Sequence, residues 1–280
     1  GIYVFSRSTL FDLLNKFPSS DSKIGSFYGD LVINNDVAYG ISYGSDEGDK
    51  CQNKSCISYL FAINIKNLNS VWPLEFIQID GAVVGGVRYS NGNLYFATSE
   101  NDSFSEKGGF FYSVDASDGQ IEYKIAIKNK VYSSVEINEE KKIAIIGDTA
   151  GNLSLYNIDD DINLTPEDRY ISTVETNYSI ISPAIHVIDS NYESHYCAGN
   201  INGDIKCFKL ENLNGFSLIE WASIKIDGWI WSDMKFISDQ NSLFVISISG
   251  NLYKISVDPD SKNLQIIWQQ EIDKNGKPVS

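Results

Sequence analysis

The sequence predicts an all-β fold, a β-propeller of about six blades that each contain four antiparallel strands. Short apolar runs of four to seven residues, such as Leu94–Thr98 and Leu243–Ser247, alternate with stretches rich in Gly, Asn, Asp and Ser. This is the pattern of β-strands joined by turns. Markers of the pattern recur with a period of roughly 50 residues, and four strands in one such period are typical of a propeller blade.

Three markers define the repeat. The first is an aromatic residue that closes a strand, with steps of 51, 47, 51 and 47 residues: Trp72, Tyr123, Tyr170, Trp221 and Trp268. The second is a glycine turn that opens an apolar strand: Gly151, Gly203 and Gly250. The third is a strand that follows a small residue: Ser133, Ser182 and Ser232. Because three independent markers share one period, we expect each repeat to be one four-stranded unit.

The chain is predicted to form a single propeller domain over residues 1–280. Its complete repeats span about 25–80, 81–127, 128–174, 175–224 and 225–273. Residues 1–24 are similar to the later strands of a further, partial blade, and Gly276–Ser280 is similar to the start of its missing first strand. We expect the two ends of the chain to pair and close the ring, which hides strand edges. The alternative is that the sequence is a piece of a longer ring.

Two segments of 11 residues carry a more specific pattern. Ser113–Tyr123 contains a small residue, Asp115, Gly119 and a closing aromatic, and Ala62–Trp72 follows the same order with fewer matches. Both resemble the tryptophan-docking motif of the PQQ-like (quinoprotein dehydrogenase-like) β-propellers. The resemblance implies that the aromatics are mostly buried between blades and that the acidic residue and glycine shape the turn. The implied docking residues are Trp72, Asp115, Gly119, Tyr123, Tyr170, Trp221 and Trp268.

The resemblance points to the non-catalytic branch of this family. The true quinone dehydrogenases usually have more blades, adjacent cysteines and a calcium or lanthanide site, whereas this chain has no Cys-Cys pair. The closer comparison is with the bacterial lipoprotein of outer-membrane protein assembly and the luminal sensor domains of eukaryotic stress kinases, which bind protein partners. PQQ and calcium are disfavoured, since Ser45–Asp49 and Asp159–Asp161 also lack the ligand spacing of a calcium loop. We predict no cofactor and no metal site.

No set of catalytic residues is found. The sequence lacks Gly-x-Ser-x-Gly, His-Glu-x-x-His and a phosphate-binding glycine loop, and its histidines are His186 and His195. We therefore predict a non-enzymatic domain for protein interaction or ligand binding, a module of a larger secreted, periplasmic or luminal protein. The alternative is a quinoprotein-like oxidoreductase or a carbohydrate-active enzyme with its site at the channel mouth.

The net charge is −15, from 22 basic and 37 acidic residues. Because phosphate groups bind to basic surfaces, this charge disfavours DNA and RNA as partners, and it disfavours an anionic membrane surface. No apolar run approaches the length of a membrane-spanning helix. The predicted partner is a protein or a small polar ligand, without insertion of this chain into a membrane.

Polar residues recur at matching places on the strands predicted to be innermost, which line the channel of a propeller. Their steps are 58, 48, 50 and 49 residues: Asp30, Arg88, Glu136, His186 and Lys235. Aromatic residues near the start of the same strands would supply the anchor contacts of a binding surface: Tyr28, Tyr132, Trp229 and Trp231. The alternative is a network of ion pairs between blades that binds no ligand.

The four cysteines form two local pairs. Cys51 and Cys56 lie in one loop, and Cys197 and Cys207 flank the Asn200–Gly203 turn on adjacent strands. A turn with an odd number of residues would place the second pair directly opposite each other. The even number and the local pairing favour disulfides and an oxidising compartment, which predicts a secreted, periplasmic or ER-luminal protein. The alternative is four free cysteines.

Overall fold

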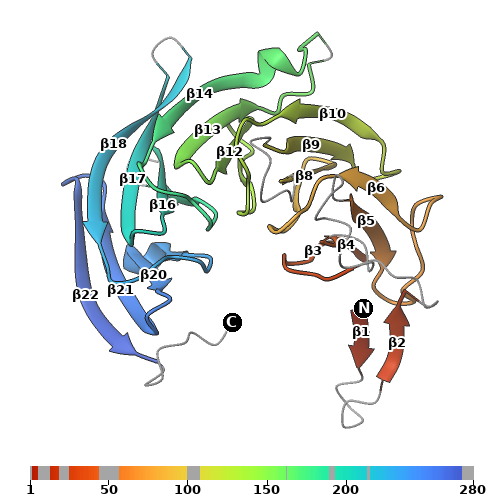
Figure 1. Cartoon of the computed structure of the whole chain (residues 1–280), viewed down its shortest axis with the longest axis horizontal. Helices are drawn as coiled ribbons and strands as arrows, with labels where there is room; N and C mark the ends of the chain where they lie inside the picture. The colour runs from red at the N-terminus through yellow and green to blue at the C-terminus, as the bar shows by residue number, and fades with distance from the viewer. Residues whose placement is uncertain are drawn as a thin grey trace. The chain divides into compact units, whose positions relative to one another are not determined.

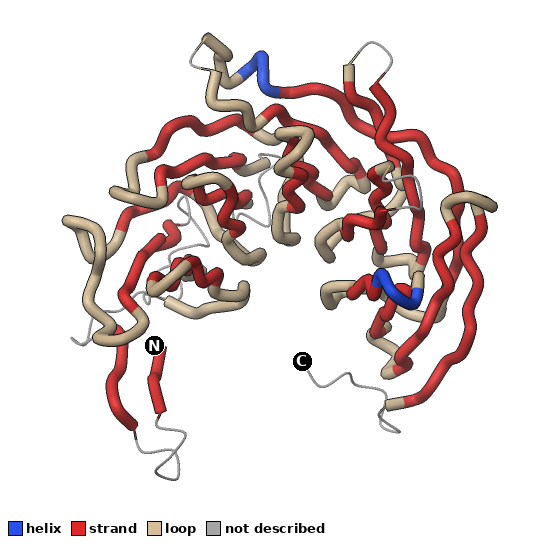
Figure 2. Tube along the Cα trace, turned by 180° about the vertical axis from the view of Figure 1, so that it is seen from behind, coloured by secondary structure: helices blue, strands red, loops and turns tan. Residues whose placement is uncertain are grey.

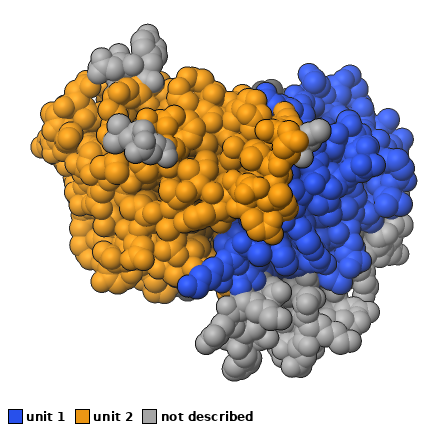
Figure 3. All heavy atoms as spheres, turned by 90° about the horizontal axis from the view of Figure 1, so that it is seen from above, with its two compact units in different colours: residues 1–128 blue, residues 129–280 orange. Residues whose placement is uncertain are grey.

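The computed structural model describes residues 2–5, 13–18, 25–43, 57–99, 108–161, 163–188, 193–212 and 215–272. Regular structure in these residues is almost entirely β-strand (Figure 2), and the strands form five four-stranded antiparallel sheets. The predicted all-β propeller fold is confirmed. The chain divides into two compact units, residues 1–128 and 129–280 (Figure 3), which are described separately. Gly276–Ser280, and with it the predicted pairing of the chain ends, lies outside the described residues.

Unit 1 contains a two-stranded hairpin and two four-stranded sheets (Figure 1). The hairpin is formed by β1 (Ile2–Phe5) and β2 (Leu13–Phe17). The first sheet contains β3 (Val32–Asn34), β4 (Val37–Ile41), β5 (Ile57–Asn64) and β6 (Ile77–Asp80). The second sheet contains β7 (Arg88–Ser90), β8 (Asn93–Ala97), β9 (Phe110–Asp115) and β10 (Ile121–Ala126). In both sheets the strands are hydrogen-bonded in chain order.

Unit 2 contains three sheets with the same order of strands. The first is β11 (Glu136–Asn138), β12 (Ile143–Gly147), β13 (Asn152–Asn157) and β14 (Tyr170–Glu175). The second is β15 (Ile185–Ile188), β16 (Ser194–Gly199), β17 (Asp204–Asn212) and β18 (Phe216–Lys225). The third is β19 (Lys235–Ile237), β20 (Ser242–Ile246), β21 (Asn251–Asp258) and β22 (Asn263–Glu271). The described residues of unit 2 also form two short 3-10 helices, η2 (Glu167–Arg169) and η3 (Ser238–Gln240).

The cores lie between neighbouring sheets of each unit. In unit 1, Leu60 and Ile79 of one sheet pack in a cluster with Phe96 and Tyr112 of the next. The second strand of a sheet is covered on both faces, so β12 and β16 are buried along their whole length. This explains why Ile143–Ile146 reads as a continuous apolar run instead of an alternating one.

The hairpin turns between the second and third strands of the unit 2 sheets have one geometry. In each turn the first residue donates a backbone hydrogen bond to the fifth, and the glycine at the fourth position donates one back to the first. The three turns are Asp148–Asn152, Asn200–Asp204 and Ser247–Asn251. Glycine is needed at Gly203 because φ is +82° and a Cβ there would lie 2.7 Å from the carbonyl oxygen of Gly228. The glycine that marks the repeat in the sequence is thus the fourth residue of this turn.

Trp72 joins the two sheets of unit 1. It lies in the connection between β5 and β6, is 4% exposed, and donates a hydrogen bond of 3.0 Å from Nε1 to the carbonyl oxygen of Ala116. Ala116 belongs to the turn between β9 and β10, which is closed by a 2.8 Å bond from the Gly119 amide to the Asp115 carbonyl. A Cβ at Gly119 would lie 3.1 Å from the Trp72 ring, so the glycine allows the indole to approach. These contacts are of the kind that the docking resemblance implied.

The other docking aromatics do not share one position, which corrects their sequence alignment. The outer strands β10, β14, β18 and β22 each carry a β-bulge, whose extra residue is Glu122, Ile171, Trp221 or Ile267, respectively. Trp221 is itself the bulge residue, Tyr123 and Trp268 follow the bulge by one residue, and Tyr170 precedes it by one. A shift of one residue places a side chain on the opposite face of the strand. The expected burial fails for Trp268, which is 37% exposed, and Tyr170 is 48% exposed, whereas Tyr123 and Trp221 are partly buried.

Candidate functional site

The segment that leads into β19 presents two tryptophans on the surface of unit 2. Along it the exposed residues are Asp227, Trp229, Trp231 and Asp233, and they alternate with less exposed ones. Trp229 is 47% and Trp231 is 59% exposed, whereas Ile230 between them has no exposed surface. We call residues 227–233 the tryptophan strip. Around Ile230 the alternation is that of an extended chain with one face on the core, whereas Gly228, at φ +72°, bends the chain beside Asp227.

Contacts from neighbouring turns hold the strip in place. The Ile230 amide donates to the carbonyl of Asn200 at 3.3 Å, and the carbonyl of Trp229 accepts from the Ile248 amide at 2.9 Å. The Ile230 side chain packs over Gly199, where any Cβ would lie 2.7 Å from its Cγ2. Further along, the Ser232 hydroxyl donates to the carbonyl of Ile246 at 3.4 Å. The two exposed indoles are therefore carried on a backbone that is fixed on both sides of the buried isoleucine.

Asp227, at the start of the strip, is positioned by three donors from β20–β21. Its carboxylate accepts hydrogen bonds from Asn251 Nδ2 at 2.7 Å, from Ser247 Oγ at 3.3 Å and from the Tyr253 hydroxyl. Burial, and secondarily the bond to Asp227, raises the pKa of Tyr253 to about 12. The phenol therefore stays protonated and remains a donor to this carboxylate at physiological pH.

The five polar residues predicted to line a channel do not occupy one register position. Arg88, Glu136 and Lys235 occupy equivalent positions on the first strand of their sheets. Each pairs with a residue of the second strand, and the residue four positions after that partner donates a backbone hydrogen bond to the segment that precedes the first strand. In the remaining two sheets this place is taken by Val32 and Ile185.

Asp30 therefore lies two residues before this position, where it is equivalent to Asp233, and His186 lies one residue after it. The equal spacing was misleading because hairpin lengths differ between sheets, and a one-residue offset reverses the face that a side chain occupies. Since the five residues are divided between the two units, a joint binding role for them stays a prediction.

The predicted aromatics are placed more consistently. In three sheets, a residue of the segment before the first strand hydrogen-bonds through its backbone to the connection between the second and third strands. The aromatic residue two positions after it is Tyr28, Tyr132 or Trp231. Trp229 is the bonded residue itself in its sheet. Tyr28 is 66% exposed and Tyr132 is half-buried. In unit 2 the equivalent of Tyr132 and Trp231 in the middle sheet is Ile181, and β15 of that sheet contacts both β11 and β19.

His186 belongs to a buried polar network that joins two sheets of unit 2. Its ring stacks on Tyr196 with centroids 4.9 Å apart, and its Nε2 lies 3.0 Å from Ser194 Oγ. Asn138 Nδ2 donates to the same Ser194 hydroxyl at 3.2 Å and to the Tyr196 hydroxyl at 2.7 Å. Burial, with a smaller effect from His195, lowers the pKa of His186. Sequence patterns gave no signal for this network, since its members come from β11, β15 and β16.

The acidic side chains that the structure describes form no cluster suited to a metal. Within the described ranges, no group of three or more His, Cys, Asp or Glu side chains could hold a metal ion. Asp159 pairs with Lys142 at 2.8 Å, and Asp161 accepts hydrogen bonds from Asn163. Ser45–Asp49 lies outside the described residues. In the part of the chain that the structure covers, no helix is long and apolar enough to cross a membrane.

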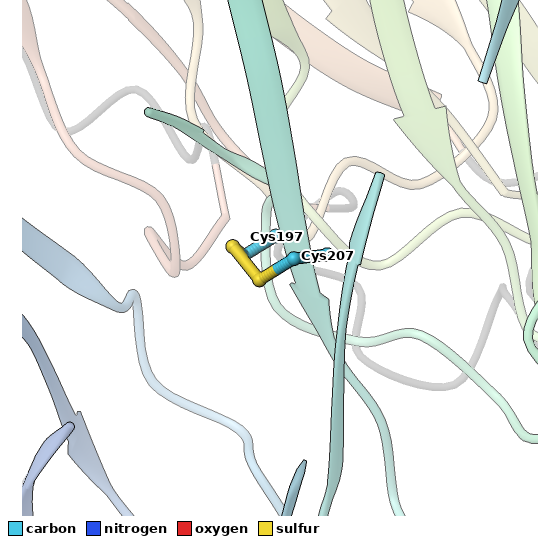
Figure 4. Close-up of a disulfide and its surroundings, with 2 residues drawn as sticks. All are labelled: Cys197 and Cys207. Carbon is cyan, nitrogen blue, oxygen red and sulfur yellow. A yellow bond between two sulfur atoms is a disulfide. The ribbon is translucent and has the colours of Figure 1, made fainter. Parts of the chain in front are cut away.

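Cys197 and Cys207 form a disulfide between β16 and β17 (Figure 4). The two residues are paired directly across the strands with Cα atoms 4.0 Å apart, because the turn between Asn200 and Asp204 holds three residues. The predicted bond and the odd turn length are confirmed. Both cysteines are fully buried. Cys51 and Cys56 lie outside the described residues, so their pairing stays a prediction.

Comparison with known proteins supports the fold. No protein-family model matches the sequence. The DNA damage-binding protein CMR1 of Kluyveromyces lactis is 26% identical over 138 residues, which cover 48% of this chain and only 26% of that protein. The periplasmic gluconolactonase PpgL of Pseudomonas aeruginosa has a TM-score of 0.60 at 11% identity, covering 97% of this chain and 78% of the other.

BamB from Moraxella catarrhalis has a TM-score of 0.57 at 12% identity, covering 90% of this chain and 63% of the other. At such low identities the two solved structures bear on the fold and leave the activity open, because one propeller scaffold hosts enzymes and binding proteins alike. The chain is similar to β-propellers of varied roles.

Proposed function

We propose that this chain is a non-enzymatic binding domain that holds a protein partner at the tryptophan strip of unit 2. The observation that carries the proposal is the exposure of Trp229 and Trp231 on either side of the fully buried Ile230. Tryptophan is enriched among residues that dominate binding energy, and a side chain on an ordered backbone loses less freedom on binding. An aromatic pair presented in this way is suited to anchoring a partner.

An extracytoplasmic location is part of the proposal. The Cys197–Cys207 disulfide supports it, since structural disulfides persist mainly in oxidising compartments. The name of CMR1 assigns binding of damaged DNA to that protein. For this chain the net charge of −15 favours a protein partner over a nucleic acid.

A comparative pull-down tests the proposal. Wild-type protein, the double variant Trp229→Ala/Trp231→Ala and the control variant Trp268→Ala would each be immobilised against an extract of the native compartment. Trp268 is a partly exposed tryptophan on β22, outside the strip. Its replacement therefore controls for non-specific binding of proteins to an exposed tryptophan. We expect one partner to be retained by wild type and control and lost by the double variant.

The enzymatic alternative is tested on the same preparations. Dye-linked oxidation would be measured after reconstitution with PQQ and calcium, and hydrolysis would be measured on a panel of glycosides. We expect no turnover. Turnover by protein that retains no partner would contradict the proposed function.

A further inference from the structure

The tryptophan strip has a carboxylate at each end. Asp227 and Asp233 are both exposed and flank the exposed indoles of Trp229 and Trp231. The flat faces of tryptophan attract cations more strongly than those of other aromatic residues, and a neighbouring carboxylate adds a direct charge interaction. Resting on the proposed function, we propose that the strip recognises an arginine side chain in an extended, basic segment of a protein partner.

The first support is the state of the Asp227 carboxylate. The groups that donate to it, from Ser247, Asn251 and Tyr253, are all neutral. They fix the orientation of the carboxylate without cancelling its charge. Because the pKa of Tyr253 is raised to about 12, the phenol does not become a competing anion near neutral pH. A cation that stacks on Trp229 thus meets a positioned negative charge.

The second support is the placement of the nearby lysines. The Lys225 Nζ lies 3.7 Å from Asp204 Oδ1, so this lysine already has an acidic partner. Lys235 is an exposed cation two residues beyond Asp233, so the charge argument rests on Asp227, whose hydrogen-bond donors are neutral. The centre of the strip, between the two carboxylates, contains no basic residue. With the overall charge of −15, this arrangement is complementary to a positive partner.

The third support comes from the equivalent segment of the adjacent sheet. The residues that match Asp227, Trp229, Trp231 and Asp233 in the segment before β15 are Asn177, Ser179, Ile181 and Pro183. That segment has the same backbone bonds to its turn but neither an exposed indole nor a carboxylate. The scaffold therefore does not require these side chains. Arginine is favoured over lysine as the bound residue because its planar guanidinium both stacks on an indole and pairs with a carboxylate.

The experiment measures binding of fluorescent peptides by anisotropy. An extended chain covers about 3.3–3.6 Å per residue, so peptides of about eight residues match the length of the strip. The probes are an alternating Gly-Arg peptide and Gly-Lys, Gly-Glu and Gly-Ser peptides of equal length. The proteins are wild type, Trp229→Ala/Trp231→Ala, Asp227→Asn/Asp233→Asn and the control Asp239→Asn, whose exposed carboxylate lies in η3. Circular dichroism of each variant shows whether it has folded.

We expect the Gly-Arg peptide to bind wild type and Asp239→Asn equally, and more tightly than the Gly-Lys peptide. Loss of both tryptophans or both carboxylates should weaken binding by about tenfold or more, which corresponds to one cation–π contact of roughly 1.4 kcal/mol. Equal binding of the Gly-Arg peptide by the folded tryptophan double variant would overturn the inference, since the attraction would then come from net charge alone. Preferential binding of the Gly-Ser or Gly-Glu peptide would overturn it as well. If the pull-down partner depends on Trp229 and Trp231 while the Gly-Arg peptide fails to bind, the proposed function stands and this inference falls.

Discussion

The indole Nε1 of Trp72 donates a hydrogen bond to the carbonyl oxygen of Ala116, 3.0 Å away in the neighbouring sheet of unit 1. The same ring packs over Gly119, so one side chain both fills the space between two sheets and satisfies a turn carbonyl. Apolar contacts between neighbouring sheets are non-directional, whereas this hydrogen bond also fixes the relative position of a connection and a turn.

The first prediction concerns this contact. Trp72→Ala should lower the free energy of unfolding by about 3–5 kcal/mol, the range for removal of a large buried aromatic. Trp72→Phe keeps part of the packing but leaves the Ala116 carbonyl unpaired, so a loss of about 1–3 kcal/mol is expected. Urea unfolding followed by fluorescence measures both. Trp268→Ala is the matched control, and a loss as large as that of Trp72→Ala would refute the assigned role of Trp72.

The second prediction compares two glycines with positive φ. Gly203 and Gly92 have φ values of +82° and +90°, but a Cβ would meet backbone atoms at Gly203 and nothing within 4 Å at Gly92. Gly92→Ala should therefore cost only the strain of a left-handed alanine, about 1–2 kcal/mol. Gly203→Ala should cost clearly more, because a backbone turn must also move. Equal losses in thermal or urea unfolding would show that the turn has room to adjust.

The third prediction follows from the lowered pKa of His186. Because the unfolded chain takes up a proton more readily than the folded one, stability should be greatest above about pH 6.5 and fall as the pH drops from there through the lowered folded value. The residues in contact with the ring, Ser194 and Tyr196, are neutral, His195 adds to the lowering of the pKa, and Glu140 is the acidic group that acts against it.

Urea unfolding of wild type and His186→Gln across this pH range measures the effect. The variant should lose the part of the pH dependence that lies just below about pH 6.5, where ordinary carboxyl groups remain ionised. Parallel curves for the two proteins would show that His186 does not titrate differently in the folded and unfolded chains.

The fourth prediction concerns the Cys197–Cys207 bond. Both residues are fully buried, so reductant should act slowly on the native protein and rapidly in denaturant. The enclosed loop is short, and its loss should destabilise the fold by about 2–3 kcal/mol in the chain-entropy estimate. Mass measurement after alkylation, with and without reduction in denaturant, detects the bond. Alkylation of both cysteines in unreduced, denatured protein would contradict the disulfide and weaken the extracytoplasmic proposal.

The sequence predicted the blades well because their signal is local. Four strands were expected in the repeat 175–224, and the sheet β15–β18 spans residues 185–225. The turn at Gly203 and the pairing of Cys197 with Cys207 also depend only on residues close in sequence. Such features follow from turn geometry and strand alternation, which a short stretch of sequence determines.

Register between repeats could not be predicted in the same way. The bulge precedes, coincides with or follows the aromatic residue in different outer strands, and Tyr170 and Trp268 were aligned with Trp72 although they are exposed. His186 was aligned with Lys235 although hairpin length places it in another layer. The sequence predicted that Trp229 and Trp231 belong to a binding surface. It could not predict the neutral donors around Asp227, because they come from the β20–β21 hairpin and follow no regular spacing in the sequence.

The shared turn of unit 2 has a consequence for protein engineering. Asp148–Asn152, Asn200–Asp204 and Ser247–Asn251 close with the same backbone bonds although their side chains differ. Each pentapeptide is therefore an exchangeable cassette whose ends are already matched to its strands. Replacing one pentapeptide with another would transfer its side chains to a different sheet of unit 2 while the strand pairing stays intact. The binding properties of these turns could therefore be changed without redesign of the strands.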